Sequence, residues 1–256
     1  MTGEPATPPF RALVRVADAA AVAAATAEFV ARLIAAALAD RGVAHVSLAG
    51  GTTPRLTYDR LELDRWAGVE LWFGDERCVG QTDPESNFRM VEESLLPHAP
   101  GALVHRIQGE LGPDAAADAY DALIRDRVAP AAGGAGDGGG AGSGGDRTPV
   151  LDVNLLGIGP DGHTASLFPG NPALAVTGRA VVGVRGAPKP PPDRVSLTLD
   201  VLRAARDTIL LVSGESKAAA LAGVLAGPGT GSPSSLLARD RLTLIVDDAA
   251  AADAAI

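Results

Sequence analysis

The chain has 256 residues, which suits a single α/β domain with a full core. Its 22 Lys and Arg against 31 Asp and Glu give a formal net charge of −9, which argues against a general nucleic-acid binder because phosphates require a basic excess. Hydrophobic residues make up 46% of the chain, so composition excludes global disorder. The single cysteine, Cys78, excludes an intrachain disulfide and favours a reducing compartment.

No segment has the pattern of a membrane span or a signal peptide. The longest stretch without Asp, Glu, Lys or Arg, residues 218–238, contains four Gly, two Pro and three Ser. The Ala-rich run that begins at Ala19 is interrupted by Glu28 and Arg32, and no basic segment precedes it. We therefore expect a cytoplasmic protein, monomeric or weakly homo-oligomeric, that binds neither membrane nor nucleic acid.

The N-terminal part of the chain predicts a flexible tail followed by a helix and a strand. Residues 1–12 are rich in Pro and Thr. A helix follows, for which Asp18 is a plausible N-cap and Gly42 a C-terminal stop. Strands are then predicted at 43–48, 69–73, 150–156, 180–184, 195–199, 208–212 and 242–246.

Helices are predicted between most of these strands. They cover residues 55–61, 87–96 with Asn87 as cap, 113–128 and 217–226, and the Ala-rich tail from Asp247 is also a candidate helix. In residues 132–145, nine of fourteen residues are Gly, a composition that behaves as a flexible coil. A domain linker is one interpretation of that segment, but the strand–helix alternation continues on both sides, which favours a surface insertion.

The alternation predicts one α/β domain over residues 13–256. We expect a doubly wound, Rossmann-like, mainly parallel sheet with helices on both faces. In such sheets, ligands bind beyond the carboxyl ends of the strands. Four of the predicted strand ends carry unusual loops.

The first of these loops is Gly50-Gly51-Thr52-Thr53-Pro54. Glycines let a backbone approach a ligand closely, and the hydroxyls and the N–H groups of the following helix can bind a phosphate. The alternative is an ordinary tight turn with a capping threonine.

The second loop, Asp75-Glu76-Arg77, can place one carboxylate in a cleft while its neighbour pairs elsewhere, and Arg77 can bind an anion. A solvated charge cluster is the alternative.

The third loop runs from Gly157 to His163 and presents a histidine among glycines. It matches G-x-G-x-x-G, but Pro169 cuts any following helix short and no acidic residue follows until Asp193, so a dinucleotide site is not expected. Imidazole suits proton transfer near neutral pH, and Asp161 can fix its tautomer. A structural histidine is the alternative.

The fourth loop, Gly214-Glu215-Ser216-Lys217, opens the next predicted helix. A lysine in a first helical turn opposes the helix dipole, which suggests that an anion binds there, with an ordinary surface lysine as the alternative.

No His or Cys pair has metal-ligand spacing, so no metal site is expected. We expect Cys78 to be a partly buried bystander and not a nucleophile.

Taken together, the loops resemble the 6-phosphogluconolactonase family, part of the glucosamine-6-phosphate isomerase superfamily. The matching segments are SLAGGTTP (47–54), WFGDER (72–77), ESNF (85–88), NLLGIGPDGHTASLF (154–168), KPPPDRVSLT (189–198) and GESK (214–217). The resemblance spans about residues 43–246. The Gly-rich segment and the Ala-rich tail lie outside its pattern.

The resemblance implies hydrolysis of 6-phosphoglucono-1,5-lactone to 6-phosphogluconate, the second step of the oxidative pentose phosphate pathway, without metal or organic cofactor. His163 is then expected as the general base and Asp161 as its orienting partner, with Arg77 as a third catalytic candidate. The expected substrate-binding residues are Gly50, Gly51, Thr52, Thr53, Asp75, Glu76, Gly159, Arg194 and Lys217.

Two other functions fit a similar pattern. Glucosamine-6-phosphate deaminases have a similar Asp-Gly-His loop, but they carry Asn-Glu-Pro shortly after it and usually Tyr where Arg77 stands. Here the corresponding stretch is Ser166-Leu167-Phe168-Pro169, without the glutamate. Related folds also serve as sugar-phosphate sensors in transcription regulators, which carry a DNA-binding helix pair. The 42 residues before the first predicted strand offer only one Ala-rich helix and a Pro-rich tail.

Overall fold

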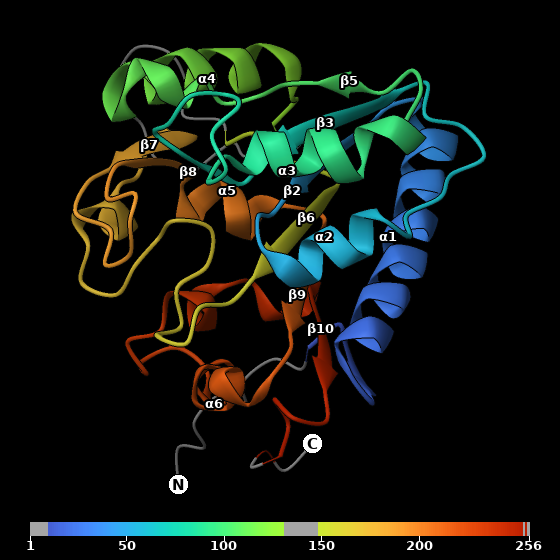
Figure 1. The fold of residues 1–256 in the computed structure, drawn as a ribbon, viewed down its shortest axis with the longest axis vertical. Coiled ribbons are helices and arrows are strands. Elements are labelled where there is room, and N and C mark those ends of the chain that lie inside the picture. Colours follow the sequence, from blue (N-terminus) through green and yellow to red (C-terminus); the bar gives the residue numbers. More distant parts are fainter. Residues whose placement is uncertain (1–9, 131–147, 253, 255–256) are drawn as a thin grey trace, which may run out of the picture.

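A computed structural model describes residues 10–130, 148–252 and 254 (Figure 1). Its main sheet has seven strands in the order β1-β10-β9-β6-β2-β3-β5, and every neighbouring pair is parallel. These strands are β1 (Ala12–Val16), β2 (Ala44–Leu48), β3 (Val69–Phe73), β5 (Leu103–Val104), β6 (Val153–Gly157), β9 (Asp207–Val212) and β10 (Leu242–Asp247). A second, antiparallel sheet has the order β4-β8-β7, with β4 (Asp75–Arg77), β8 (Arg194–Leu197) and β7 (Val181–Val184).

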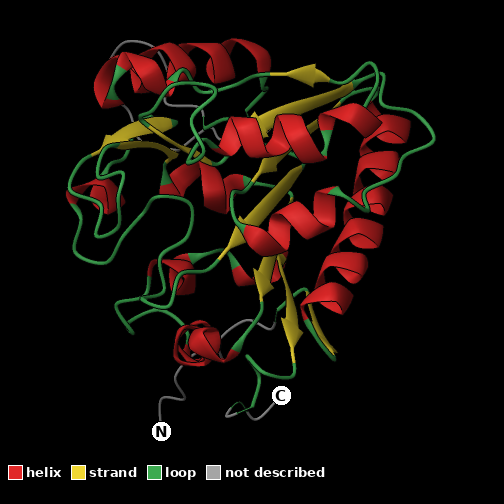
Figure 2. Ribbon diagram, viewed as in Figure 1, coloured by secondary structure: helices red, strands yellow, loops and turns green. Residues whose placement is uncertain are grey.

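Helices cover both faces of the main sheet (Figure 2). They are α1 (Ala19–Arg41), α2 (Thr52–Tyr58), α3 (Asn87–Ser94), α4 (Pro113–Arg127), α5 (Leu199–Ala204) and α6 (Ala218–Ala226). Successive side chains of β3 point to opposite faces. The ring centroid of Phe73 lies 5.9 Å from that of Phe88 in α3, and the ring centroid of Trp72 lies 5.8 Å from that of Tyr120 in α4. The expected α/β architecture with a mainly parallel sheet is confirmed.

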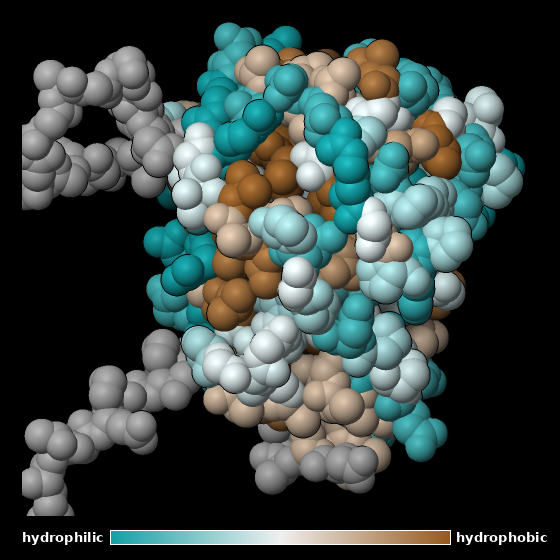
Figure 3. All heavy atoms as spheres, turned by 90° about the vertical axis from the view of Figure 1, so that its left-hand side faces the viewer, coloured by the Kyte–Doolittle hydropathy of each residue, from teal (hydrophilic) through white to brown (hydrophobic). Residues whose placement is uncertain are grey.

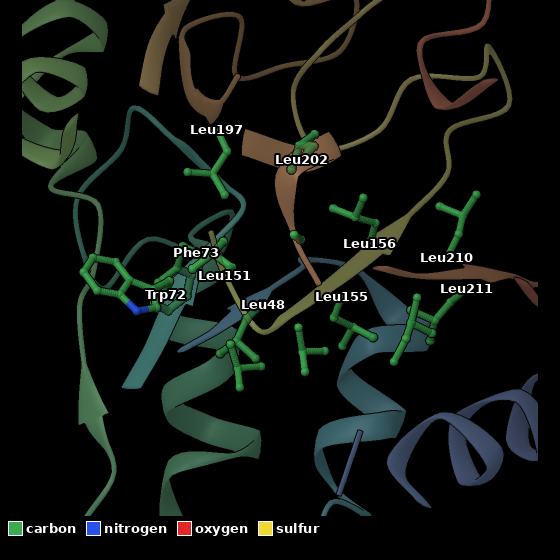
Figure 4. Close-up of a cluster of buried hydrophobic side chains, with 14 of the residues drawn as sticks. Leu48, Trp72, Phe73, Leu151, Leu155, Leu156, Leu197, Leu202, Leu210 and Leu211 are labelled. Carbon is green, nitrogen blue, oxygen red and sulfur yellow. The ribbon is translucent and has the colours of Figure 1, made fainter. Parts of the chain in front are cut away.

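The central strands are apolar on both faces because helices cover both. Leu155 and Leu156 of β6 point to opposite sides of the strand and are each about 1% exposed (Figure 4). Leu210 and Leu211 of β9 extend the same core. Continuous apolar runs of this kind are typical of buried parallel strands.

Helix α1 is long and apolar enough, by length and composition, to cross a membrane. In the structure, however, its buried side chains, among them Val22, Val30 and Ile34, form part of the hydrophobic core, and the helix packs against β2, β9 and β10. We interpret α1 as a core helix. Its predicted ends are correct, because the Asp18 side chain accepts a hydrogen bond from the backbone N–H of Ala21 and Gly42 ends the helix in a left-handed conformation.

The structure differs from the predicted elements at the N-terminal edge of the sheet. Strand β1 was not predicted, and it begins at residue 12, inside the expected tail. It pairs in parallel with β10, about 230 residues further along the chain. Residues 1–9 and the Gly-rich segment 132–145 lie outside the described residues.

Several boundaries also differ. Helix α2 begins at Thr52, three residues before the predicted start. Ser86, not Asn87, caps α3, since its hydroxyl accepts a hydrogen bond from the backbone N–H of Arg89. The strands predicted at 180–184 and 195–199 form in the second sheet together with β4, which was expected as a loop. Residues 248–252 form turns, so the predicted C-terminal helix is wrong there.

The topology places a crevice between β2 and β6. From β2 the chain continues through α2 to β3 on one side, and β6 pairs with β9 on the other side. Connections that diverge in this way leave room between the loops at the carboxyl ends of the two strands. Seen from the left-hand side of Figure 1, the surface carries a central group of apolar side chains between hydrophilic ones (Figure 3).

Candidate active site

A cavity of about 140 Å³ lies at the carboxyl ends of β2, β3 and β6. Its walls are Ala49, Gly50, Gly51, Asp75, Arg77, Asn87, Gly157, Ile158, Gly159, His163, Ala165 and Arg194. Seven of the residues expected in the site are therefore brought together. They are Gly50, Gly51, Asp75, Arg77, Gly159, His163 and Arg194.

Glycines make the loop after β6 tight enough to fold back on itself. The backbone N–H of Gly159 donates to the carbonyl of His163 at 2.8 Å, and the N–H of Gly162 donates to the carbonyl of Gly159 at 2.9 Å. A Cβ at Gly159 would lie 2.0 Å from Nδ1 of His163, and Gly162 has a φ of +80° that favours glycine. Both glycines are needed for the histidine to stand where it does.

His163 is paired with Asp161 at the cavity wall. Its Nδ1 lies 2.5 Å from Oδ1 of Asp161, and its ring centroid lies 4.5 Å from that of Phe168. Burial alone would raise the pKa of the Asp161 carboxyl, but the hydrogen bond from His163 and its charge outweigh that effect, and the pKa is lowered. An ionised carboxylate at Nδ1 favours the tautomer with hydrogen on Nδ1, which leaves Nε2 free to accept a proton.

Asp75 is the buried carboxylate of the cavity. Its Oδ2 accepts a hydrogen bond from the hydroxyl of Ser166 at 2.5 Å. Nδ2 of Asn87 donates to the Asp75 backbone carbonyl at 2.9 Å and lies 3.3 Å from Oδ1. Asn87 also packs against Gly50, where a Cβ would lie 2.0 Å from the amide oxygen. Asp75 is thus held in place from two other segments of the chain.

Glu76 does not face the cavity, and its assignment to the substrate site is corrected. Its carboxylate is 2% exposed and accepts hydrogen bonds from the backbone N–H groups of Arg77, Asn87 and Phe88 at 2.8, 2.7 and 2.8 Å. It also accepts one from the Ser86 hydroxyl at 3.1 Å. Burial raises the pKa of the Glu76 carboxyl, and the backbone N–H groups oppose that rise. Glu76 therefore serves the N-terminus of α3.

Two guanidinium groups, those of Arg77 and Arg194, line the cavity. Burial lowers the pKa of Arg194, and the charge of Arg77 lowers it further, so the two cations act on each other. Arg194 donates from Nε and Nη2 to the carbonyls of Pro191 and Lys189 at 3.1 and 3.0 Å. Arg77 donates from Nη1 to the carbonyl of Glu85, and its buried Nε has no hydrogen-bond partner among the described residues. Arg77 also pairs with the Glu85 carboxylate at 3.4 Å, and Asp75 lines the same cavity. Two guanidinium groups against one carboxylate in the cavity wall favour an anionic ligand.

Four of the nine expected binding residues lie outside this cavity: Glu76, described above, and Thr52, Thr53 and Lys217. Thr52 lines a neighbouring cavity of about 570 Å³, which shares Gly51, Arg77 and Asn87 with the first. Thr53 lies within α2, where its carbonyl accepts a hydrogen bond from the Thr57 hydroxyl.

Lys217 lies outside both cavities but close to the catalytic loop. Burial lowers the pKa of the Lys217 ammonium, the nearby charge of Lys189 lowers it further, and Asp161 opposes the shift. Lys189 and Lys217 are the only lysines in the sequence. Lys217 thus stands within electrostatic range of both Lys189 and Asp161.

Asn87, Ser166 and Ala165 were given no role in the site from the sequence. Asn87 was expected only to cap a helix. Ser166 was named only as part of the stretch that lacks the glutamate of the deaminases. Both residues nevertheless stand in the segments that match the family. Ala165 lines the cavity with a φ of +47°, a left-handed conformation that costs a non-glycine residue about 1–2 kcal/mol. No feature of the sequence indicates that conformation.

The described residues contain no cluster of three His, Cys, Asp or Glu side chains that could hold a metal ion. Burial raises the pKa of the Cys78 thiol to about 11, which keeps it protonated near neutral pH. A protonated thiol is a poor nucleophile. Cys78 is therefore not expected to act as a nucleophile.

Comparisons with known proteins agree with this geometry. A family model described as glucosamine-6-phosphate isomerases/6-phosphogluconolactonase matches residues 17–246. A 6-phosphogluconolactonase of Streptomyces coelicolor is 39% identical over 243 residues, covering 90% of this chain and 88% of that protein. A 6-phosphogluconolactonase of Mycobacterium leprae is 38% identical, covering 82% of this chain and 84% of the relative.

This chain belongs to the 6-phosphogluconolactonase family. The fold agrees, since the solved structure of 6-phosphogluconolactonase from Trypanosoma cruzi superposes with a TM-score of 0.83 at 27% identity, covering 97% of this chain and 98% of that one. The family expected from the loop segments is confirmed. Membership assigns the chain to the enzymes that share this fold.

Proposed function

We propose that this chain hydrolyses 6-phosphoglucono-1,5-lactone to 6-phosphogluconate, the second step of the oxidative pentose phosphate pathway. The observation that carries the proposal is that His163, which is paired with Asp161, lines the same cavity as Arg77 and Arg194. A base beside two cations suits attack of water on the ester of an anionic sugar. The names of the relatives in the family support the choice of substrate.

In the proposed reaction, Nε2 of His163 takes a proton from water as the water oxygen attacks the lactone carbonyl. Asp161 holds the imidazole through Nδ1 and stabilises the imidazolium that forms. Arg77 stabilises the negative charge that develops on the carbonyl oxygen. The bond between the carbonyl carbon and the ring oxygen then breaks, and the imidazolium returns its proton to that oxygen, which becomes a hydroxyl group.

The electropositive groups would bind the two ends of the substrate. Small-molecule sites usually enclose about 300–1,000 Å³, so the 140 Å³ cavity alone accommodates only part of a hexose phosphate. We place the lactone against His163 and the phosphate among Arg194, Lys217 and the Gly50–Gly51 turn. Water is the nucleophile and imidazole the base, so the reaction as proposed uses no metal or organic cofactor.

A deaminase of glucosamine 6-phosphate is the second candidate for this fold, but the loop does not favour it. The stretch after His163 lacks the glutamate of the deaminases. It contains Ser166, whose hydroxyl donates a hydrogen bond to the Asp75 carboxylate. A sugar-phosphate sensor is the third candidate, and it would bind the ligand without turnover. Ammonia release and lactone loss separate the three functions.

The test generates fresh 6-phosphogluconolactone with glucose-6-phosphate dehydrogenase and follows its loss against spontaneous hydrolysis. We expect wild type to accelerate the loss and His163→Ala to lower kcat by about 10²–10⁴-fold, the usual contribution of a general base. The exposed His98, changed to Asn, is the matched control and should keep wild-type kcat. A kcat of His163→Ala within a few-fold of wild type removes His163 from the base role, and ammonia from glucosamine 6-phosphate would favour the deaminase.

A further inference from the structure

Three buried serines lie in the segment that follows α6. Ser232, Ser234 and Ser235 are 8%, 0% and 2% exposed, and Ser234 and Ser235 belong to a short 3-10 helix, Pro233–Leu236. Buried hydroxyls are costly unless they are hydrogen-bonded, so the partners of these groups indicate what the segment holds. The segment does not line the catalytic cavity.

Two of the serines hold one carbonyl of the catalytic loop. The Ser232 hydroxyl donates to the carbonyl of Gly162 at 3.1 Å, and the backbone N–H of Ser234 donates to the same oxygen at 3.0 Å. Both lone pairs of that oxygen are thereby used. The Ser232 and Ser234 hydroxyl oxygens lie 2.9 Å apart, and the Ser235 hydroxyl donates back to the Ser232 carbonyl at 2.6 Å.

The contact is steric as well as polar. A Cβ on Gly162 would lie 2.2 Å from the Ser232 hydroxyl oxygen. On its other side, the N–H of Gly162 is held by the carbonyl of Gly159. The residue between Asp161 and His163 is thus fixed at its N–H, its carbonyl and its α-carbon.

We propose that Ser232 is a positioning residue for the Asp161–His163 pair, an inference that rests on the proposed function. The carbonyl of Gly162 belongs to the peptide unit that joins Gly162 to His163. Holding this carbonyl therefore holds the His163 backbone, and with it the position of Nδ1 relative to the Asp161 carboxylate. Ser232 touches neither the cavity nor the reacting atoms in this arrangement. Its influence reaches the reaction only through the orientation of the loop.

The test compares Ser232→Ala with Ser235→Ala. The two serines are alike in size and both are buried, but among the described residues the Ser235 hydroxyl bonds to the Ser232 carbonyl within its own turn and not to the Gly162 carbonyl. We expect Ser232→Ala to lower kcat by about threefold to tenfold, the effect of losing one hydrogen bond, with KM unchanged. Ser235→Ala should keep kcat within about twofold. Ser232→Cys, which keeps the size and a weak donor, should recover part of the loss.

A spectroscopic signature distinguishes positioning from a general loss of stability. The proton between Nδ1 of His163 and Asp161 should give a downfield NMR signal, assigned by its absence in His163→Ala. We expect this signal to shift in Ser232→Ala and to stay in place in Ser235→Ala at temperatures where both are folded. An unmoved signal, an equal loss of kcat in both alanine variants, or a rise in KM at constant kcat would overturn the proposal. If wild type does not hydrolyse the lactone, the proposed function fails, and the NMR comparison still decides whether Ser232 positions the pair.

Discussion

The carboxylates of Asp75 and Glu76, neighbours on β4, serve opposite sides of that strand. Asp75 lies on the cavity wall, where its Oδ2 accepts the Ser166 hydroxyl at 2.5 Å. Glu76 points away from the cavity and accepts the N–H groups of Asn87 and Phe88. The alternation of side chains along a strand separates a carboxylate of the site from one that supports the fold.

The first prediction is that Glu76 matters for stability and not for substrate binding. Glu76→Ala leaves three backbone N–H groups without their acceptor, two of them buried and that of Arg77 partly buried, and each buried group costs about 1–3 kcal/mol if it stays unsatisfied. We expect a loss of at least about 3 kcal/mol in the free energy of unfolding, measured by urea titration. In the fraction that remains folded, KM should stay at the wild-type value.

The exposed Glu92, on the same helix that Glu76 supports, is the control for this prediction. Glu92→Ala should change the free energy of unfolding by less than about 0.5 kcal/mol. A Glu76→Ala protein as stable as Glu92→Ala but with a greatly increased KM would return Glu76 to the substrate site.

The sequence predicts those parts of the fold that depend on local pattern. The apolar runs of β3, β6 and β9 and the caps at Asp18 and Gly42 are local signals, and each led to a correct element. Strands β1 and β4 are five and three residues long, and each owes its place to a partner far along the chain. No local signal specifies such pairings.

The residues of the site also differ in whether a local pattern in the sequence could predict their role. His163 was predictable because glycines around a histidine at a strand end are a local pattern. The role of Asn87 depends on the missing side chain of Gly50 and on Asp75, and the role of Ser166 depends on a carboxylate 91 residues away. Glu76 was misassigned because the sequence does not show which face of β4 meets the cavity.

The second prediction concerns the space that Gly159 leaves for the catalytic pair. In Gly159→Ala, the new Cβ would lie 2.0 Å from Nδ1 of His163 and 2.5 Å from Oδ1 of Asp161, so the pair must separate. Losing a hydrogen bond to a charged group costs about 1.5–3 kcal/mol, which corresponds to a kcat lowered about 10- to 150-fold. Steady-state kinetics with fresh lactone measures the change.

Gly80→Ala controls for the substitution itself, because a Cβ there meets nothing within 4 Å and the backbone has no left-handed φ. We expect it to keep wild-type kcat. If Gly159→Ala were equally active, the close contact of His163 with Asp161 would not be needed for turnover.

The third prediction is that acid destabilises the protein through His45. This side chain is 8% exposed, and its Nδ1 accepts a hydrogen bond from Nε1 of Trp72 at 3.3 Å. Burial lowers the pKa of His45; the charges of Glu70 and Asp152 oppose the shift, and His105 and Arg41 reinforce it. Because the folded pKa lies below the unfolded value of about 6.5, the unfolded chain takes up the proton first. Stability contributed by neutral His45 is complete above that pH and is lost as the pH falls below it.

His45→Asn tests this, since the amide oxygen can replace Nδ1 as acceptor for Trp72. Urea titrations at pH 7.5, 6.0 and 5.0 should show a shallower loss of stability for His45→Asn than for wild type, by up to about 1.4 kcal/mol per pH unit. His98→Asn, at an exposed histidine, should follow the wild-type slope. Equal slopes for wild type and His45→Asn would place the acid sensitivity in other groups.

The fourth prediction assigns Lys217 to the phosphate end of the substrate. Its ammonium group stands close enough to Asp161 and Lys189 to feel their charges, yet outside the cavity that holds His163. A charge-assisted contact with phosphate is worth about 1.5–3 kcal/mol, so Lys217→Ala should raise KM for the phosphorylated lactone about tenfold or more with kcat little changed. Glucono-1,5-lactone, which lacks the phosphate, supplies the matched comparison. With that substrate, wild type and Lys217→Ala should have the same kcat/KM, because the lost contact does not exist. An equal penalty on both lactones would place Lys217 near the ring and leave Arg194 as the anchor of the phosphate.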